Sequence, residues 1–217
     1  MLTEVQNEIP GEVRLLFQEG EEIFSGAKKI VADGGMDGVD AVFGMHGMPI
    51  DIGFYDIKPG YRMAGCDTIY VKFEGVSGHG SSPHLAKDTI LPAAEFVTQL
   101  NAMITKFVNS QSPLDLTVGK FDAGTKANII SKYAKLDISM RYLEEETRRT
   151  IHEKIRNLAA GLAIIYDVKI DVDIEESAIS MRNDERIAEI ANKSAERIFG
   201  PNKNVNGPIL MGSEDMP

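Results

Sequence analysis

The stretch CDTIYVKFE, residues 66–74, decides how the middle of this chain folds. Ile69, Val71 and Phe73 alternate with polar residues, which places the apolar side chains on one face of a β-strand. Three later runs alternate in the same way, and two longer segments repeat apolar residues at helical spacing. The later strand runs centre on Leu116, Leu136 and Val172, and the helical segments carry Leu100 and Ile155 on their apolar faces.

The elements of residues 65–176 follow the order strand, helix, strand, strand, helix, strand. That order is typical of the split βαβ, ferredoxin-like arrangement, in which one antiparallel sheet carries both helices on one face. Asp88 precedes the first helix as a candidate N-cap. We therefore predict a ferredoxin-like βαββαβ domain over residues 65–176.

The segment before this domain predicts part of an α/β domain. Residues 13–17 and 39–43 have the composition of strands, and residues 23–31 between them repeat apolar side chains at helical spacing. The Gly34-Gly35 pair ends that helix. Strand, helix, strand indicates a βαβ unit and a parallel sheet.

The segment after the domain is expected to return to the first one. Residues 48–65 are rich in Gly and Pro and are predicted to be a linker, and residues 184–199 predict a helix that a Gly-Pro pair ends. Residues 1–64 and 177–217 are thus expected to form one α/β domain, interrupted by the inserted domain. Because no closing element follows, we expect the sequence to be part of a longer protein.

Composition narrows the kinds of partner. The formal net charge is -10, whereas nucleic acid and anionic membranes favour a basic surface. No apolar run approaches the ~20 residues that a membrane-spanning helix needs, and the N-terminus lacks the pattern of a signal peptide. The only cysteine is Cys66, which excludes a disulfide within the chain and fits a reducing compartment. We expect a cytoplasmic protein whose partners are small molecules or proteins.

Three polar residues follow the predicted strands of the first domain. Glu21 and Glu22 come after residues 13–17, and His46 comes after residues 39–43. Because the carboxyl ends of neighbouring parallel strands share one edge of a sheet, these side chains are expected to converge there. A carboxylate and an imidazole suit a zinc-type metal, and a second carboxylate suits a general base. The alternative is that two glutamates at a helix start only complement the helix dipole.

The ferredoxin-like domain offers three further candidates for ligand contacts. His79 stands between two glycines, where an imidazole is open to act as a hydrogen-bond donor, although an exposed turn histidine has the same pattern. Asn128 lies in a glycine-containing loop, where asparagine usually serves the turn. Arg141 is on the polar side of its strand, where it would either hold a carboxylate or be solvated. Of the other two histidines, His84 is expected to be structural and His152 to lie on a solvated helix face.

Five ordered motifs together resemble one family. The motifs are RLLFQEGEE at 14–22, VDAVFGMH at 39–46, GHG with PH at 78–84, AG with NII at 123–130, and GSED at 212–215. They resemble the amidohydrolase subfamily of peptidase family M20, the aminoacylase-type metallopeptidases, which includes N-acyl-amino-acid amidohydrolases, hippurate hydrolases and plant auxin-conjugate hydrolases. The resemblance covers nearly the whole chain. It implies a partial zinc-peptidase-like α/β catalytic domain with an inserted ferredoxin-like lid that serves as the dimerisation domain.

The resemblance implies roles for the residues of the first domain. Glu21 matches the general base, and Glu22 and His46 match metal ligands. Carboxypeptidase-type members have an acidic residue where this chain has His46, so the histidine favours an acyl-amino-acid amidohydrolase. The implied mechanism is attack of metal-activated water on an amide carbonyl, with Glu21 taking the water proton and returning it to the leaving amine.

The resemblance also implies roles for the lid and for a second subunit. His79 matches the lid histidine that, in dimers of the family, reaches the partner's active site and polarises the scissile carbonyl. Asn128 and Arg141 match lid positions that bind substrate. A homodimer formed through the lid is therefore expected, with an N-acyl amino acid as the small-molecule substrate.

The sequence departs from the family in its metal ligands, and Glu19-Gly20 also stands where Pro-Ala is usual, outside the ligand set. The Cys-Gly-His-Asp type segment that supplies further metal ligands is absent, and so is the final histidine ligand beyond the GSED motif. With Glu22 and His46 alone, a site for two zinc, manganese, cobalt or nickel ions is not completed by this chain. We therefore expect the chain by itself to bind metal poorly and to have little or no activity. Two alternatives stay open: a catalytically inactive association module, or a related desuccinylase or aminopeptidase-like enzyme.

Overall fold

The computed structural model describes residues 4–20 and 25–214. The chain divides into two compact units, residues 1–43 and residues 44–217. Every strand that the structure describes lies in the second unit.

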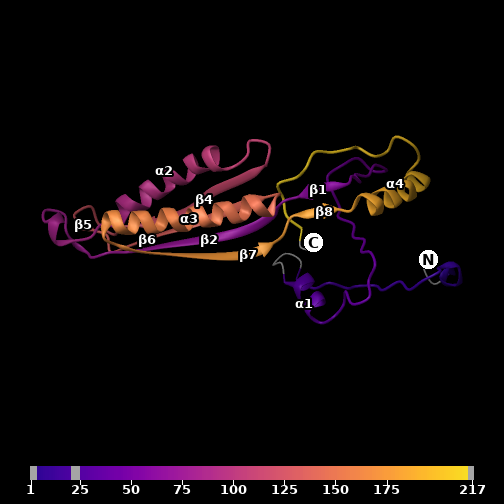
Figure 1. The fold of residues 1–217 in the computed structure, drawn as a ribbon, viewed down its shortest axis with the longest axis horizontal. Coiled ribbons are helices and arrows are strands. Elements are labelled where there is room, and N and C mark those ends of the chain that lie inside the picture. Colours follow the sequence, from indigo (N-terminus) through magenta and orange to yellow (C-terminus); the bar gives the residue numbers. More distant parts are fainter. Residues whose placement is uncertain (1–3, 21–24, 215–217) are drawn as a thin grey trace. The chain divides into compact units, whose positions relative to one another are not determined.

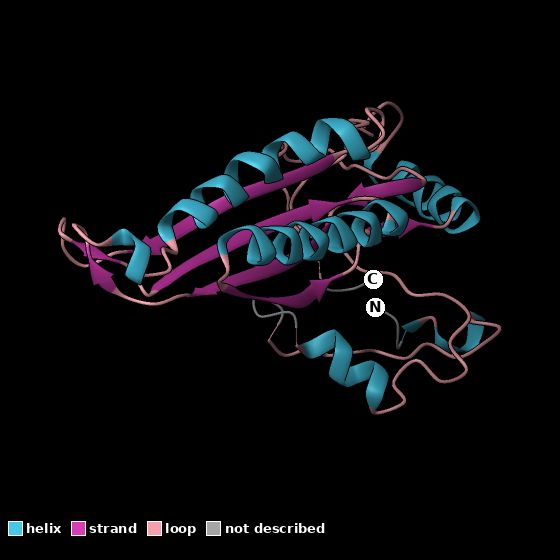
Figure 2. Ribbon diagram, turned by 60° about the vertical axis from the view of Figure 1, so that its left-hand side comes forward, coloured by secondary structure: helices cyan, strands magenta, loops and turns pink. Residues whose placement is uncertain are grey.

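A four-stranded antiparallel sheet forms the centre of the second unit, with two long helices on one of its faces (Figures 1 and 2). The strands are β2 (Gly65–Glu74), β4 (Leu114–Ala123), β6 (Tyr133–Tyr142) and β7 (Lys169–Ala178), and the helices are α2 (Ile90–Phe107) and α3 (Glu145–Tyr166). In space the strands follow the order β4-β6-β2-β7, and all neighbours are antiparallel. The predicted ferredoxin-like βαββαβ arrangement is therefore confirmed.

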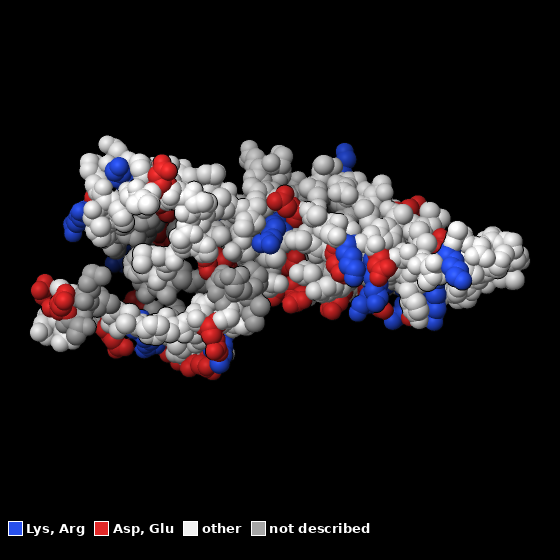
Figure 3. All heavy atoms as spheres, turned by 180° about the vertical axis from the view of Figure 1, so that it is seen from behind, with Lys and Arg blue, Asp and Glu red and all other residues white. Residues whose placement is uncertain are grey.

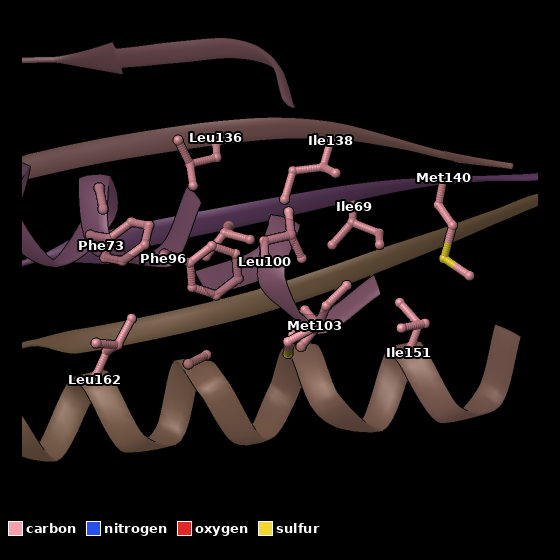
Figure 4. Close-up of a cluster of buried hydrophobic side chains, with 14 of the residues drawn as sticks. Ile69, Phe73, Phe96, Leu100, Met103, Leu136, Ile138, Met140, Ile151 and Leu162 are labelled. Atoms are coloured by element: carbon pink, nitrogen blue, oxygen red, sulfur yellow. The ribbon is translucent and has the colours of Figure 1, made fainter. Parts of the chain in front are cut away.

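Alternation along the strands builds the core of this domain. On β2, the side chains of Ile69, Val71 and Phe73 are buried, whereas Lys72 between them is exposed. The buried side chains meet the apolar stripes of α2 and α3, and Phe96 packs edge-on against Phe73 at a ring-centroid distance of 5.9 Å (Figure 4). One hydrophobic cluster thus joins both helices to the sheet.

The opposite face of the sheet carries charged side chains. Lys72 on β2, Lys135 on β6, and Asp171 and Asp173 on β7 are all exposed. Figure 3 shows Lys and Arg side chains next to Asp and Glu side chains on the visible surface of this domain. The sheet therefore buries apolar surface on its helix side and presents a polar surface on the other.

Asp67, Arg148 and His152 form a buried ionic cluster between β2 and α3. The Asp67 carboxylate is 0% exposed, accepts hydrogen bonds from Arg148 Nε at 2.8 Å and Nη2 at 3.0 Å, and lies 2.8 Å from His152 Nε2. Arg148 Nη2 also lies 2.7 Å from a carboxylate oxygen of Glu176 on β7. The prediction that His152 lies on a solvated helix face is wrong. It follows Arg148 by one helical turn, so both side chains face Asp67.

Acid is expected to weaken the fold through Asp67. Burial alone would raise the pKa of this carboxyl, but the hydrogen bonds from His152 and Arg148 and the charge of Arg148 hold the pKa below its ordinary value. A depressed pKa in the folded state gives stability that is complete above the unfolded pKa of about 3.9 and is lost as the pH falls through the folded pKa. Urea unfolding of the chain from about pH 7 downward should therefore show a loss of stability that begins near pH 4 and continues below it.

The variant Asp67→Asn tests this assignment, because it removes the titrating carboxyl. Its free energy of unfolding should be lower than that of the parent at neutral pH and should depend less on pH in acid. Asp115→Asn, at an exposed position of β4, is the matched control and should keep the parent's pH profile. An Asp67→Asn profile as steep as the parent's would place the acid sensitivity elsewhere.

The chain enters and leaves the ferredoxin-like domain through two paired strands. β1 (Gly60–Met63) runs antiparallel to β8 (Met181–Asn183), with Met63 opposite Met181. The prediction of a linker over residues 48–65 is therefore wrong for its last part. Four residues are too few to show an alternating pattern, and their pairing partner lies far along the sequence.

Two aspartates satisfy N–H groups at helix starts. Asp88 accepts hydrogen bonds from the N–H groups of Ile90 and Leu91, the first two residues of α2. Asp184 is the N-cap of α4 (Glu185–Phe199) and accepts from the N–H of Ile187. The helix predicted over residues 184–199 is thus confirmed. No helix within residues 4–20 and 25–214 combines the length and apolarity needed to cross a membrane.

The first unit contains a short α-helix, α1 (Gly26–Ala32), and the 3-10 helix η2 (Gln6–Glu8) among its described residues. Gly34, with φ +78°, follows α1 as the predicted glycine stop. The strands predicted at residues 13–17 and 39–43 are not present, so the prediction of a βαβ unit is wrong for the structure described. A strand needs a neighbour for its backbone N–H and C=O groups, and an apolar run in the sequence does not show whether that neighbour is there.

Candidate functional site

His46 lies beside Glu214 in the second unit, and its side chain is open to solvent. His46 Nδ1 is 2.9 Å from Oε2 of Glu214. The His46 side chain is 52% exposed, while that of Glu214 is only 12% exposed. A carboxylate thus holds one nitrogen of an imidazole whose ring remains accessible.

The segment that carries Glu214 is fastened to the base of the sheet. The N–H of Ala64 donates a hydrogen bond to the carbonyl oxygen of Gly212 at 2.8 Å. Arg141 Nη1, from β6, donates to Ser213 Oγ at 2.5 Å. Two residues predicted from the sequence are therefore joined: Arg141 contacts Ser213, and His46 contacts the adjacent Glu214.

Cys66 lies next to this cluster but is not a candidate nucleophile or ligand. Its side chain is buried, and burial raises the pKa of the thiol, although the charge of Arg141 and a hydrogen bond with Ser213 act against that shift. A thiol with a raised pKa stays protonated at neutral pH. Nucleophilic attack and metal binding both require the thiolate.

His79 and Asn128 lie together beyond the other end of the sheet. The two-residue strand β3 (Gly78–His79) pairs with β5 (Ile129–Ile130), and the N–H of Gly80 donates to the carbonyl oxygen of Asn128 at 2.8 Å. Both the His79 and the Asn128 side chains are exposed. The structure therefore brings these two predicted residues into one loop cluster.

The His79 ring is held by the residue two positions later. Nδ1 of His79 lies 2.7 Å from Ser81 Oγ and accepts a hydrogen bond from the N–H of Ser81 at 3.2 Å. Gly78 is needed for this loop, because a Cβ there would lie 2.7 Å from the Cβ of Ala86. The glycine thus permits the close approach of two backbone segments that positions the histidine. His84 lies exposed in η4 (Pro83–Leu85).

The two clusters are far apart within one chain. β2 and β6 remain paired along ten residues each. Arg141 is near one end of that pairing, and His79 follows the other end. At ~3.3 Å per residue, about 30 Å separates the two ends. His79 of one chain therefore does not reach the cluster of Arg141 and His46 in the same chain.

The predicted metal ligands are described only in part. Glu21 and Glu22 lie outside the described residues. Across residues 4–20 and 25–214, no group of three or more His, Cys, Asp or Glu side chains is placed to hold a metal ion. His46 nevertheless fits one ligand position, because Glu214 engages Nδ1 and leaves Nε2 on the far side of an exposed ring.

Glu214 was not predicted to contact His46. It is part of the GSED motif, but the two residues are 168 positions apart, and no local pattern pairs them. The sequence offers one indication of this contact: both residues lie in motifs that resemble the same family.

Comparison with known proteins gives consistent results. Residues 63–167 match the peptidase dimerisation domain family. The chain is 36% identical over 211 residues to the hippurate hydrolase of Campylobacter jejuni, which covers 94% of this chain and 55% of that protein. It is 35% identical over 164 residues to the N-acyl-L-amino acid amidohydrolase of Geobacillus stearothermophilus. That match covers 75% of this chain and 44% of that protein.

A solved structure extends this similarity to the fold. A dinuclear metal binding peptidase of the M20 family from Bacillus subtilis matches 99% of this chain and 54% of its own, with a TM-score of 0.80 and 27% identity. The chain spans about half the length of the curated relatives it matches.

Proposed function

Because the chain belongs to peptidase family M20, we propose that the protein containing it hydrolyses the amide bond of N-acyl amino acids with the help of divalent metal ions. The observation that carries this proposal is the 36% identity, over 94% of the chain, to a relative named hippurate hydrolase. A second relative is named as an N-acyl-L-amino acid amidohydrolase. The buried Cys66, a thiol without a disulfide, suits the cytoplasm.

Glu21, Glu22 and His46 carry the proposed chemistry. Glu22 and His46 would hold the metal, and zinc, manganese, cobalt and nickel all accept such mixed carboxylate and imidazole ligation. A bound divalent ion lowers the pKa of water and polarises the amide carbonyl. Glu21 takes the proton of the attacking water and returns it to the leaving amine.

The lid, residues 65–176, contributes the substrate contacts in this proposal. Arg141 supplies a guanidinium that suits the carboxylate of the amino acid, and Asn128 supplies an amide for hydrogen bonds to the substrate. Residues 1–64 and 177–217 form part of the catalytic domain.

The separation of the two clusters supports a homodimer formed through the lid. Since the paired length of β2 and β6, about 30 Å, separates Arg141 from the loop that carries His79, one chain does not bring both to one substrate. The match of residues 63–167 to a dimerisation domain supports pairing of two lids. His79 of each subunit then donates a hydrogen bond to the scissile carbonyl in the other subunit.

The match to a dimerisation domain also supports a second function for this chain alone, which is association without catalysis. The experiment that separates the two compares the 217-residue chain with the product of the full reading frame that encodes it. Both are analysed for bound metal and assayed on N-acetyl, N-benzoyl and N-succinyl amino acids. The full product should hydrolyse at least one class, and the chain alone should show little activity.

The general base has its own test in the active protein. Glu21→Gln should lower the rate by about 10²–10⁴-fold, because the amide cannot accept the water proton. Glu12→Gln, at an exposed position of the same unit, is the matched control. The proposal fails if the full product, supplied with zinc, manganese, cobalt or nickel, hydrolyses none of these substrates.

A further inference from the structure

We propose that Glu214 and Ser81 act as positioning residues that hold His46 and His79 in opposite ring tautomers. The inference rests on the proposed function, in which His46 binds a metal ion and His79 donates a hydrogen bond to a carbonyl. A metal ligand needs a ring nitrogen with a lone pair, and a donor needs a ring N–H. The contact at Nδ1 of His46 leaves a lone pair on its other nitrogen, and the contacts at Nδ1 of His79 leave an N–H on its other nitrogen.

At His46 the contact requires a hydrogen on Nδ1. Oε2 of Glu214 lies 2.9 Å from Nδ1, and an ionised carboxylate only accepts hydrogen bonds. The hydrogen between the two atoms therefore belongs to His46. In the neutral ring Nε2 then has no hydrogen, and its lone pair points away from Glu214. This is the arrangement in which a carboxylate orients a histidine that binds a metal through its other nitrogen.

The position of Glu214 is itself fixed by its neighbours. The carbonyl of Gly212 accepts the N–H of Ala64 at 2.8 Å, and Ser213 Oγ accepts from Arg141 Nη1 at 2.5 Å. Hydrogen bonds thus hold both residues that precede Glu214. They fix the backbone position from which the Glu214 side chain extends. Arg141 thus supports the orientation of His46 from the lid strand β6.

At His79 the contact excludes a hydrogen on Nδ1. The backbone N–H of Ser81 points at this atom over 3.2 Å, and a backbone N–H only donates. Ser81 Oγ, at 2.7 Å, is able to donate to the same nitrogen. Nδ1 is therefore the acceptor, and the neutral ring carries its hydrogen on Nε2. The outward nitrogen of His79 is a donor, whereas the outward nitrogen of His46 is an acceptor.

The tautomers are read from long-range ¹H–¹⁵N correlation spectra of the imidazole rings. The 217-residue chain is measured without metal or substrate in mildly alkaline buffer, since the two tautomers are distinguished in the neutral form of an imidazole ring. His46→Asn and His79→Asn assign the signals. We expect the parent chain to show the hydrogen on Nδ1 of His46 and on Nε2 of His79.

The variant Glu214→Ala removes the acceptor of His46 and leaves His79 untouched. It should shift the His46 pattern from the Nδ1–H form toward the Nε2–H form, while the His79 signals stay in place and report an intact fold. Glu189→Ala, which removes an exposed carboxylate paired with Lys193 on α4, is the matched control and should change neither ring.

Three results would overturn the inference: a His46 ring with its hydrogen on Nε2 in the parent, a His46 pattern that Glu214→Ala does not change, or a His79 ring with its hydrogen on Nδ1. Because the spectra involve neither metal nor substrate, they decide the tautomers whether or not the protein hydrolyses N-acyl amino acids. Loss of hydrolysis with intact tautomers would reject the proposed function alone.

Discussion

Replacement of Arg148 by alanine is expected to lower the free energy of unfolding of the chain by about 3–5 kcal/mol. Asp67, which is 0% exposed, would lose the bidentate partner that donates to it from 2.8 Å and 3.0 Å. The loss is costly because solvent does not reach the buried carboxylate, and the single contact with His152 at 2.8 Å does not replace the bidentate cation. Urea unfolding followed by circular dichroism at neutral pH measures the change.

The adjacent residue Arg149 supplies the matched control. It is exposed on the same helix, so Arg149→Ala removes an arginine side chain with its charge and leaves Asp67 paired. Its effect should stay within about 0.5 kcal/mol. If the two alanine variants were equally stable, the Asp67 and Arg148 pair would contribute nothing specific to the fold.

Replacement of Phe96 by alanine is expected to cost about 3–5 kcal/mol of unfolding free energy. Phe96 is 0% exposed and packs edge-on against Phe73 at the centre of the cluster that joins α2 to the sheet. The substitution removes the transfer free energy of the ring and leaves a cavity that rigid neighbours fill only in part. Thermal and urea unfolding of the variant measure the loss.

Phe107→Ala is the control for this substitution, because Phe107 ends the same helix with its side chain 52% exposed. The ring contacts Lys154 at 4.8 Å, and its loss should cost less than about 1 kcal/mol. A Phe96→Ala variant as stable as Phe107→Ala would mean that the core is repacked around the missing ring.

The core of the ferredoxin-like domain was predictable because its signal is local. Ile69, Val71 and Phe73 alternate within a single strand, and Leu100 and Ile155 repeat at helical spacing, so each element shows its buried face without reference to any other. The order of those elements then leaves few arrangements that bury all the apolar faces at once.

The errors arose where a partner distant in sequence decides the structure. Residues 13–17 have the apolar run of a strand, yet no strand lies beside them among the described residues. His152 is flanked by a charged residue in the sequence, but Asp67 on another element draws it into the interior. The contact of Glu214 with His46 depends on two loops that only the folded chain brings together.

For the candidate site, the sequence predicted which residues take part, and the structure shows which of them lie together. Arg141 and His46 are joined through Ser213 and Glu214, and His79 stands with Asn128 at the other end of the sheet. This two-ended grouping follows from the length of β2 and β6, which no single motif reveals. Glu21 and Glu22 lie outside the described residues, and their roles stay predictions.

The pairing of Met63 with Met181 has a consequence for the order in which the chain assembles. Once the ferredoxin-like domain has folded, its two ends are already neighbours, so the flanking segments meet as if a tight turn joined them. Folding of the domain has then already lost the conformational entropy of bringing its two ends together. Pairing of the flanking segments does not lose that entropy again. Early folding of the domain would therefore speed the docking of α4 beside residues 54–60.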